Sequence, residues 1–400
     1  MNQLLGSCLG LISGKPWETL KQTVELPFLH RSSTHYVSEI QEFTKSFMER
    51  LSSEKPSLRD ERRLHPVRDL KLLPFLFVAK VLYGELSKEA QDELLEIIPQ
   101  REKVFMNVVS GGITRFWFAQ FLPFPAYRAL YEFKARWAAW NDRVHAQAIK
   151  AQLSASQSPI IGMYESVARG AGTREQLLQT LDEMLFANLD VTMGGLSWPL
   201  VFLATHPEVQ KELRAEMRAN SDPSSRDAYL LSSTKTTPTL LGACLLEAAR
   251  LRPLAAFSVP QSAPTPRVLD GFEIPAGTKY VIDSYALNIR DPFWGDDREK
   301  FIPQRWLDRL KSGRDLRYRY WRFGFGPRTC LGKYVAELIL RNVIVEVLER
   351  WQISFIVAKD GKDGEKTEEM DWPWNDEMWI HHPDLWLKCE PLAATDSVQP

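Results

Sequence analysis

The most informative part of the sequence is the loop Phe323-Gly324-Phe325-Gly326-Pro327-Arg328-Thr329-Cys330-Leu331-Gly332. Its three glycines allow tight turns and close approach of the backbone to another group. Backbone N–H groups in such turns can donate to a thiolate and so tune a metal that the thiolate binds. A helix predicted to begin just after Cys330 would place its positive dipole end beside a sulfur anion. Residue by residue, a glycine-rich turn around a buried, inert cysteine would explain the same pattern.

Taken as a whole, the loop resembles the Phe-x-x-Gly-x-Arg-x-Cys-x-Gly haem-binding signature of cytochromes P450 at every fixed position. The matching residues are Phe323, Gly326, Arg328, Cys330 and Gly332. The resemblance implies that Cys330 is the ligand of a haem b iron, since the thiolate in this family favours O–O cleavage. It also implies that Phe323 packs near the sulfur and that Arg328, a permanently charged guanidinium, meets a haem propionate.

The resemblance implies a mainly α cytochrome P450 fold with a small β-rich portion, as a single domain over residues 1–400. The composition agrees with a large globular core, because 44% of the residues are hydrophobic and 25% are charged. A net charge of -1 gives no reason to expect nucleic acid as a partner. The few cysteines, at positions 8, 244, 330 and 389, contain no CxxC pair and indicate a reducing compartment.

Hydrophobic periodicity predicts several amphipathic helices, which cover residues 35–52, 85–105, 126–151, 239–251 and 334–351. Residues 174–218 predict a buried helix that is irregular around Gly194-Gly195 and Pro199, followed by a turn at His206-Pro207 and a polar helix from Glu208. The segment 219–238 is rich in Ser, Thr and Pro, and predicts a loop. Short strands are expected within 257–282 and 376–389.

Two further motifs resemble the family's charged network. Glu247 and Arg250 form an i,i+3 pair among leucines, similar to Glu-x-x-Arg, and Arg305 in Pro303-Gln304-Arg305 is similar to the partner Pro-x-Arg. The resemblance implies that Glu247, Arg250 and Arg305 form a buried structural network that braces the cysteine loop. Read alone, the Glu247–Arg250 pair is equally typical of a solvated helix surface.

Trp17 and Lys21 resemble the family's Trp-x-x-x-Arg element, whose basic residue meets a haem propionate. Lys21 replaces the arginine and would supply a point charge in place of a bidentate fork. An ordinary surface lysine is the alternative.

The segment Ala187-Asn188-Leu189-Asp190-Val191-Thr192 resembles the family's oxygen-activation motif, in which an acid precedes a threonine. Val191 occupies the usual threonine position and Asn188 replaces a glycine. Because Asn188 and Thr192 are one helical turn apart and share a face, they can form a different proton path. We therefore expect Asp190, Thr192 and Asn188 to serve in oxygen activation. The alternative is that Asn188 and Thr192 only bond locally within the helix.

Basic residues are concentrated near the cysteine loop, with eleven basic and three acidic residues between 298 and 333. Such a patch would steer an acidic electron-donor protein, and the resemblance implies NADPH-cytochrome P450 reductase. The basic side chains are those of Arg298, Lys300, Arg305, Arg309, Lys311, Arg314, Arg317, Arg319, Arg322, Arg328 and Lys333.

The resulting functional hypothesis is an NADPH- and O2-dependent monooxygenase that inserts one oxygen atom into a small apolar molecule. The sequence resembles P450s of fungal secondary metabolism, in particular those that act on diketopiperazine toxin precursors. Full-length members are anchored to the endoplasmic reticulum on its cytoplasmic side. No apolar stretch here reaches the length of a membrane-spanning helix. The family's Trp-x-x-x-Arg element normally follows a longer leading segment than the one before Trp17, so the resemblance implies that the anchor, the first strand pair and the pocket-capping loop are missing. Two alternatives stay open: a catalytically impaired haem-binding remnant and a peroxide-using P450.

Overall fold

The computed structural model describes residues 2–112, 116–122, 124–232, 238–311, 316, 318–356, 372–375 and 380–392. These residues form two compact units. Unit 1 consists of residues 1–36, 71–192 and 334–336, and unit 2 consists of residues 37–70, 193–333 and 337–400. Helices dominate both units, which agrees with the mainly α fold expected from the sequence.

Unit 1 is helical and is stabilised by an aromatic core. Trp137 stacks on Trp140 at a centroid distance of 5.4 Å and meets Phe186 edge-on at 5.4 Å, while Phe186 also contacts Phe75. Its main helices are α2 (Lys15–Val24), α6 (Leu72–Tyr83), α7 (Lys88–Ser110), α8 (Pro125–Lys150), α9 (Ile160–Ala168) and α10 (Arg174–Phe186). The short pieces are α1 (Asn2–Leu5), η1 (Leu26–Phe28), α3 (His30–Ser33), η2 (Thr34–Tyr36), η4 (Trp117–Phe121) and η5 (Ala187–Leu189).

Local capping explains where two helices of unit 1 begin. Ser87 accepts the Ala90 N–H at the start of α7, and Thr173 forms a reciprocal capping box with Gln176 at the start of α10. Such caps pair N–H groups that lack helical partners and contribute about 1 kcal/mol each. The helices predicted over 85–105 and 126–151 are confirmed as α7 and α8.

Unit 2 combines helices with small antiparallel sheets. Its helices are α4 (Val37–Glu54), α5 (Pro56–Arg59), α11 (Val191–Thr205, whose first two residues belong to unit 1), α12 (Pro207–Ala219), α13 (Pro223–Leu230), α14 (Leu240–Leu251), α15 (Gln304–Lys311) and α16 (Lys333–Arg350). Three further turns are η6 (Ala286–Arg290), η7 (Pro292–Trp294) and η8 (Gly326–Arg328). The helices predicted over 35–52, 239–251 and 334–351 are confirmed as α4, α14 and α16.

The largest sheet has the strand order β1-β7-β4, with β1 (Arg63–Leu64), β4 (Trp351–Phe355) and β7 (Leu387–Pro391). Ile353 faces Cys389 across the β4–β7 ladder, and both side chains are fully buried. A second pair joins β5 (Trp374–Asn375) to β6 (His382–Pro383). Strands β6 and β7 fall within or beside the strand region predicted at 376–389, of which residues 376–379 lie outside the described part of the chain.

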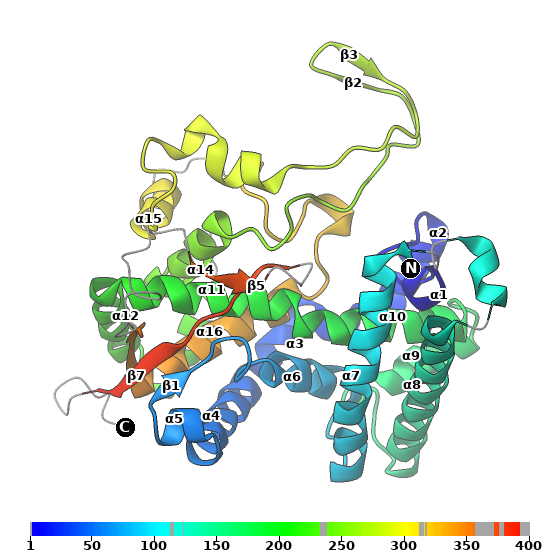
Figure 1. The fold of residues 1–400 in the computed structure, drawn as a ribbon, viewed down its shortest axis with the longest axis horizontal. Coiled ribbons are helices and arrows are strands. Elements are labelled where there is room, and N and C mark those ends of the chain that lie inside the picture. The colour runs from blue at the N-terminus through cyan, green and yellow to red at the C-terminus, as the bar shows by residue number, and fades with distance from the viewer. Residues whose placement is uncertain are drawn as a thin grey trace. The chain divides into compact units, whose positions relative to one another are not determined.

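A two-stranded hairpin, β2 (Arg267–Leu269) and β3 (Phe272–Ile274), lies within the region predicted to contain strands (Figure 1). Its turn is Asp270-Gly271 with φ of +50° and +82°, as a type I′ hairpin turn requires. Register places Leu269 opposite Phe272, and these two side chains are 69% and 71% exposed. The hairpin therefore buries little apolar surface.

The structure corrects two details of the predicted elements. The irregular point in the 174–218 helix lies at η5 rather than at Gly194-Gly195 and Pro199, which are all inside α11. The break falls at Asn188 because its side-chain amide binds the carbonyls at the end of α10. The predicted loop 219–238 contains helix α13, which Pro223 at its first turn favours.

Among the residues that the structure describes, no helix has both the length and the apolar character needed to cross a lipid bilayer.

Candidate haem-thiolate site

The cysteine loop is a closed turn in unit 2. The Cys330 N–H donates to the Phe323 carbonyl at 2.7 Å, which joins the two ends of the loop. Gly324 and Gly326 have φ of +81° and +67°, a left-handed conformation in which a side chain would be strained. The hydroxyl of Thr329 donates to the Gly326 carbonyl at 2.6 Å and tightens the turn further. Gly324 and Gly326 therefore adopt the tight turns that the sequence predicted, whereas Gly332, with φ of -80°, does not need a glycine for its backbone conformation.

A second contact holds the loop to α16, the helix that follows it. Arg322, which precedes Phe323, donates to the Glu337 carboxylate of α16. The Arg322 guanidinium also lies 4.7 Å from the centroid of the Phe323 ring, and Glu337 pairs with Arg341 at 3.5 Å. These contacts fix the chain immediately before the loop to the helix immediately after it.

Cys330 differs from the other three cysteines in its exposure. Its side chain is exposed, whereas Cys8, Cys244 and Cys389 are fully buried, and none of the four forms a disulfide. Burial raises the pKa of the Cys389 thiol to about 12 and also raises the pKa of the Cys8 and Cys244 thiols. Cys330 is therefore the cysteine that a cofactor can reach, and the alternative of a buried, inert cysteine does not hold.

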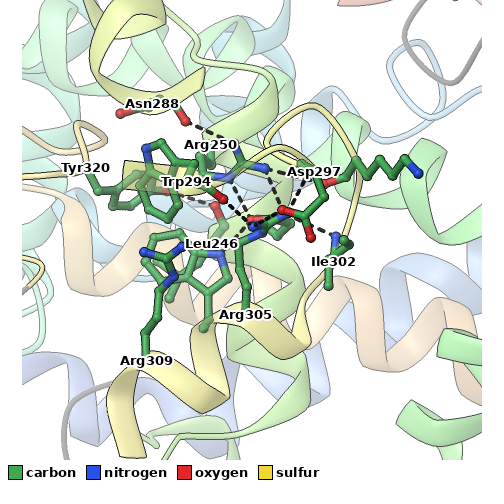
Figure 2. Close-up of polar contacts among 12 residues, drawn as sticks. Leu246, Arg250, Asn288, Trp294, Asp297, Ile302, Arg305, Arg309 and Tyr320 are labelled. Carbon is green, nitrogen blue, oxygen red and sulfur yellow. Dashed lines mark hydrogen bonds and ion pairs between the residues drawn. The ribbon is translucent and has the colours of Figure 1, made fainter. Parts of the chain in front are cut away.

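Glu247 is the centre of a buried charged network, and Figure 2 shows two of its partners, Arg250 and Arg305. Arg250 binds its carboxylate with two hydrogen bonds of 2.8 Å, and Arg305 adds one of 2.9 Å. The Trp306 indole N–H donates to the same carboxylate at 2.8 Å, and the Ile302 N–H donates at 3.2 Å. Glu247 and Arg250 have no exposed surface, so the alternative of a solvated surface pair is excluded.

The two arginines of the network also bind backbone carbonyls of neighbouring segments. Arg250 donates to the Asn288 carbonyl at 3.0 Å, and its guanidinium lies 5.0 Å from the Trp294 ring centroid. Arg305 donates to the Trp294 carbonyl at 2.9 Å and to Asp297, whose side-chain carboxylate is 3.0 Å away. A hydrogen bond from Arg305 lowers the pKa of the Asp297 carboxyl. The sequence-predicted trio of Glu247, Arg250 and Arg305 is therefore brought together.

The residues of the oxygen-activation motif lie in unit 1, at the junction of α10, η5 and α11. The Asn188 amide Nδ2 donates to the Met184 and Leu185 carbonyls at 2.7 and 3.1 Å. This orients Oδ1 as an acceptor, and the Thr192 hydroxyl donates to it at 2.8 Å. Asp190 is half-buried between η5 and α11. The structure thus pairs Asn188 with Thr192, and since all these bonds are local, they agree with the alternative of local bonding as well as with a proton path; the role in oxygen activation stays a prediction.

Trp17 and Lys21 share one face of α2 in unit 1. The Lys21 ammonium lies 5.4 Å from the Trp17 ring centroid and 3.3 Å from the Glu25 carboxylate. Lys21 is therefore partly neutralised by its neighbour, and its predicted contact with a propionate stays a prediction.

Some of the basic residues between 298 and 333 make contacts inside unit 2. Arg305 belongs to the charged network, and Arg309 lies over the Phe293 and Trp294 rings at 4.4 and 5.0 Å. Arg319 lies over Phe293 at 5.2 Å, but its side chain is 54% exposed, so its charge still faces solvent. Arg314 and Arg317 are outside the described residues. The sequence therefore overestimates the basic charge that faces solvent here.

Comparisons with known proteins agree with the geometry of the cysteine loop. The family model described as cytochrome P450 matches residues 6–373 of the chain. The chain belongs to the cytochrome P450 family. Family membership confirms the resemblance seen in the loop, and with it the monooxygenase class, haem b bound through a cysteine thiolate, and electrons from NADPH through a reductase.

Fungal P450 monooxygenases are among the relatives. The chain is 45% identical to cytochrome P450 monooxygenase aclC of Aspergillus oryzae, over 97% of this chain and 76% of that protein. It is 42% identical to asaD of Aspergillus flavus, with coverage of 97% and 71%, and 35% identical to gliC of Aspergillus fumigatus, with coverage of 98% and 74%. A zebrafish cytochrome P450 solved with progesterone has the same fold, with a TM-score of 0.72 at 20% identity over 98% of this chain and 86% of that one.

The residues around Cys330 fit the cofactor of this P450 family. A side-chain carbon added at Gly326 or Gly332 would meet no other atom within 4 Å, so the backbone there borders open space. An exposed sulfur between two such glycines suits a large flat cofactor that must approach the backbone closely. The half-buried Phe323 and Arg328 belong to the same loop.

Three residues near the site were missed by reasoning from the sequence. Trp306 donates directly to Glu247, and Asn288 and Trp321 bond to each other at the entry to the cysteine loop. Trp306 follows Arg305 directly in the Pro-x-Arg-Trp segment, so its position was a usable signal. Asn288 and Trp321 are 33 residues apart in the sequence, and no local pattern connects them.

Proposed function

We propose that Cys330 is the thiolate ligand of haem b in this P450 monooxygenase. The observation that carries the proposal is that the exposed Cys330 side chain lies in a closed loop bordered by open space at Gly326 and Gly332. When bound, the haem supplies the activation and transfer of one oxygen atom from O2. The protein's part is to hold the sulfur, position the substrate and limit water.

Further residues are proposed to hold the haem. Arg328 supplies a fixed positive charge for a propionate, and Lys21 supplies a second charge that Glu25 partly offsets. Phe323 and Trp17 are proposed to pack against the cofactor. The charged network of Glu247, Arg250 and Arg305 holds the surrounding backbone, which is a structural rather than a catalytic role.

The test of the proposal is the reduced carbon monoxide spectrum of the haem-loaded full chain, followed by product formation with NADPH and a reductase. A thiolate-type spectrum and NADPH-dependent product support a monooxygenase. A spectrum without thiolate character would contradict the role of Cys330, and product formed only with added peroxide would favour a peroxide-using enzyme.

We propose that Thr192 and Asn188 control proton delivery, together with Asp190. Because the Asn188 amide is oriented by two carbonyls, the Thr192 proton points to Asn188 Oδ1 and its oxygen keeps lone pairs for a water. The Thr192 hydroxyl can then relay a proton, because it can accept one from a water at its oxygen and donate its own. In this proposal, Thr192 and Asn188 deliver the proton that the family's threonine delivers at the position that Val191 occupies here.

The Thr192→Val variant is expected to form about 10-fold less product per NADPH consumed and to release correspondingly more peroxide, since positioned proton transfer commonly contributes about 100-fold or more. The measurement is the ratio of product to peroxide at equal haem loading. Thr205→Val, in the same helix with a hydroxyl that bonds the Phe202 carbonyl and the His206 ring but not Asn188, is the matched control. Unchanged product and peroxide in Thr192→Val would remove Thr192 from this role.

The electron donor is proposed to be NADPH-cytochrome P450 reductase. The exposed Lys300 and the half-buried Arg298 place positive charge close in sequence to the loop, although Arg305 and Arg309 are engaged internally. Charge complementarity of this kind chiefly speeds association, so the reductase should act faster at low ionic strength.

The proposed substrates are small apolar molecules of fungal secondary metabolism, and diketopiperazines are the class we favour. Support comes from the fungal P450 monooxygenases among the relatives and from the likeness of the segment 185–197 to such enzymes. Incubation of the reconstituted chain with a panel of cyclic dipeptides and with size-matched linear dipeptides would test this class.

We also propose that units 1 and 2 form one P450 domain, since the family match runs through both.

A further inference from the structure

Asn288 lies in the π-helical turn η6 and has no exposed surface. Its side-chain Nδ2 donates to the Trp321 carbonyl at 2.7 Å, and the Trp321 N–H donates back to Asn288 Oδ1 at 2.7 Å. One side-chain amide thus satisfies both backbone groups of a residue 33 positions later. Two such bonds fix the position and the orientation of the Trp321 backbone together.

The backbone of Asn288 is itself held by the charged network. Its carbonyl accepts a hydrogen bond from Arg250 at 3.0 Å, and the preceding Leu287 carbonyl accepts the Trp294 indole N–H at 2.9 Å. Figure 2 shows Asn288 joined to Arg250 by this bond. Asn288 therefore connects a buried ion pair on one side with Trp321 on the other.

Trp321 in turn supports the cysteine loop. Its indole meets the Phe325 ring edge-on at 5.0 Å, and it lies 3.8 Å from the position that a side-chain carbon would take at Gly324. Two residues after Trp321, the Phe323 carbonyl accepts the Cys330 N–H at 2.7 Å. A shift of the Trp321 backbone would therefore move the residues that pair with Cys330.

We propose that Asn288 is a positioning residue that fixes the cysteine loop to the charged network. It rests on the proposed function, in which Cys330 ligates haem b. Asn288 does not touch the cofactor in this role. It acts through Trp321, and the buried amide explains why a loop rich in glycine keeps one conformation.

The test compares two substitutions, Asn288→Ala and Asn288→Asp, with the parent chain. Alanine removes both bonds to Trp321. Aspartate keeps the size of asparagine and the acceptor for the Trp321 N–H, but it places an oxygen against the Trp321 carbonyl. The matched control is Asn342→Ala, because Asn342 is also buried, yet within the described residues its side chain bonds the Leu338 carbonyl of its own helix and not a distant segment.

Hydrogen exchange of residues 318–332 in the full chain gives a readout that does not depend on activity. We expect this segment to exchange about 10-fold faster in both Asn288 variants, because two buried hydrogen bonds that hold the Trp321 backbone are lost or opposed. In the haem-loaded chain, the reduced carbon monoxide spectrum should show a larger fraction without thiolate ligation. Asn342→Ala should leave both measurements at the parent values.

Parent-like exchange and parent-like spectra in both Asn288 variants would overturn the proposal. Equal loosening of residues 318–332 by Asn342→Ala would also overturn it, since the effect would then be general destabilisation. A parent chain without any thiolate spectrum would contradict the function proposed for Cys330, and the exchange comparison would still decide whether Asn288 holds the loop.

Discussion

The Cys330→Ser variant is expected to lose the thiolate-type reduced carbon monoxide spectrum completely and at least about 100-fold of its product formation, since even partners of a metal ligand typically change affinity or activity by 10–100-fold. A serine hydroxyl remains protonated at neutral pH and does not donate electron density as a thiolate does. No other cysteine can replace it, because Cys8, Cys244 and Cys389 are fully buried. The measurement is the spectrum together with product yield at matched haem concentration.

The control for this experiment is Cys389→Ala. Cys389 lies in β7, where it faces Ile353, and burial raises the pKa of its thiol to about 12. Its loss should lower stability but leave the spectrum of the folded protein unchanged. Retention of the thiolate spectrum by Cys330→Ser would show that another residue ligates the iron.

The Arg250→Ala variant is expected to lose about 3–5 kcal/mol of unfolding free energy, the usual cost of removing one partner of a buried ion pair. Glu247 would keep Arg305, Trp306 and the Ile302 N–H as partners but would lose both hydrogen bonds from Arg250. Since whole domains are stable by only about 5–15 kcal/mol, this loss should remove a large part of the chain's stability and lower the urea concentration at which it unfolds. Urea unfolding of the haem-loaded chain measures the loss.

Two further variants show whether the loss of stability comes from the buried hydrogen bonds or from the removal of any arginine. Arg250→Lys keeps a positive charge but cannot bind the carboxylate with two parallel hydrogen bonds, so an intermediate loss is expected. Arg128→Ala removes an arginine from the solvent-exposed pair with Glu132 and should leave stability unchanged. An Arg250→Ala chain as stable as the parent would show that the network is not needed for folding.

Much of the site could be predicted because its residues are close in sequence. The cysteine loop spans ten residues, and its glycines and cysteine have local geometric roles that the structure confirms. The Glu247–Arg250 pair is one helical turn apart, and its burial followed from the surrounding leucines. Helices α4, α7, α8, α14 and α16 were predicted because their periodic apolar faces are long.

The features that were missed depend on contacts between distant segments. Asn288 acts through Trp321, and the break between α10 and α11 depends on which carbonyls the Asn188 amide reaches. Gly194 and Pro199 were the expected irregular points, but both lie inside α11, where Gly194 packs closely against Leu254. Helix α13 was predicted as a loop because the segment is rich in Ser and Pro. A tertiary contact holds this helix, since the Tyr229 hydroxyl donates to Glu216 of α12. Tertiary contacts override weak local preference in each case.

The β2–β3 hairpin has a consequence for how this chain tolerates sequence change. Leu269 and Phe272 keep about seventy per cent of their surface in water, whereas Ile353 keeps none. Stabilisation by an apolar side chain scales with the area it removes from solvent, so truncation of Leu269 or Phe272 costs the folded chain little. Folding therefore imposes almost no selection on these two positions, and drift there could proceed without loss of the native state, in contrast to the core strands.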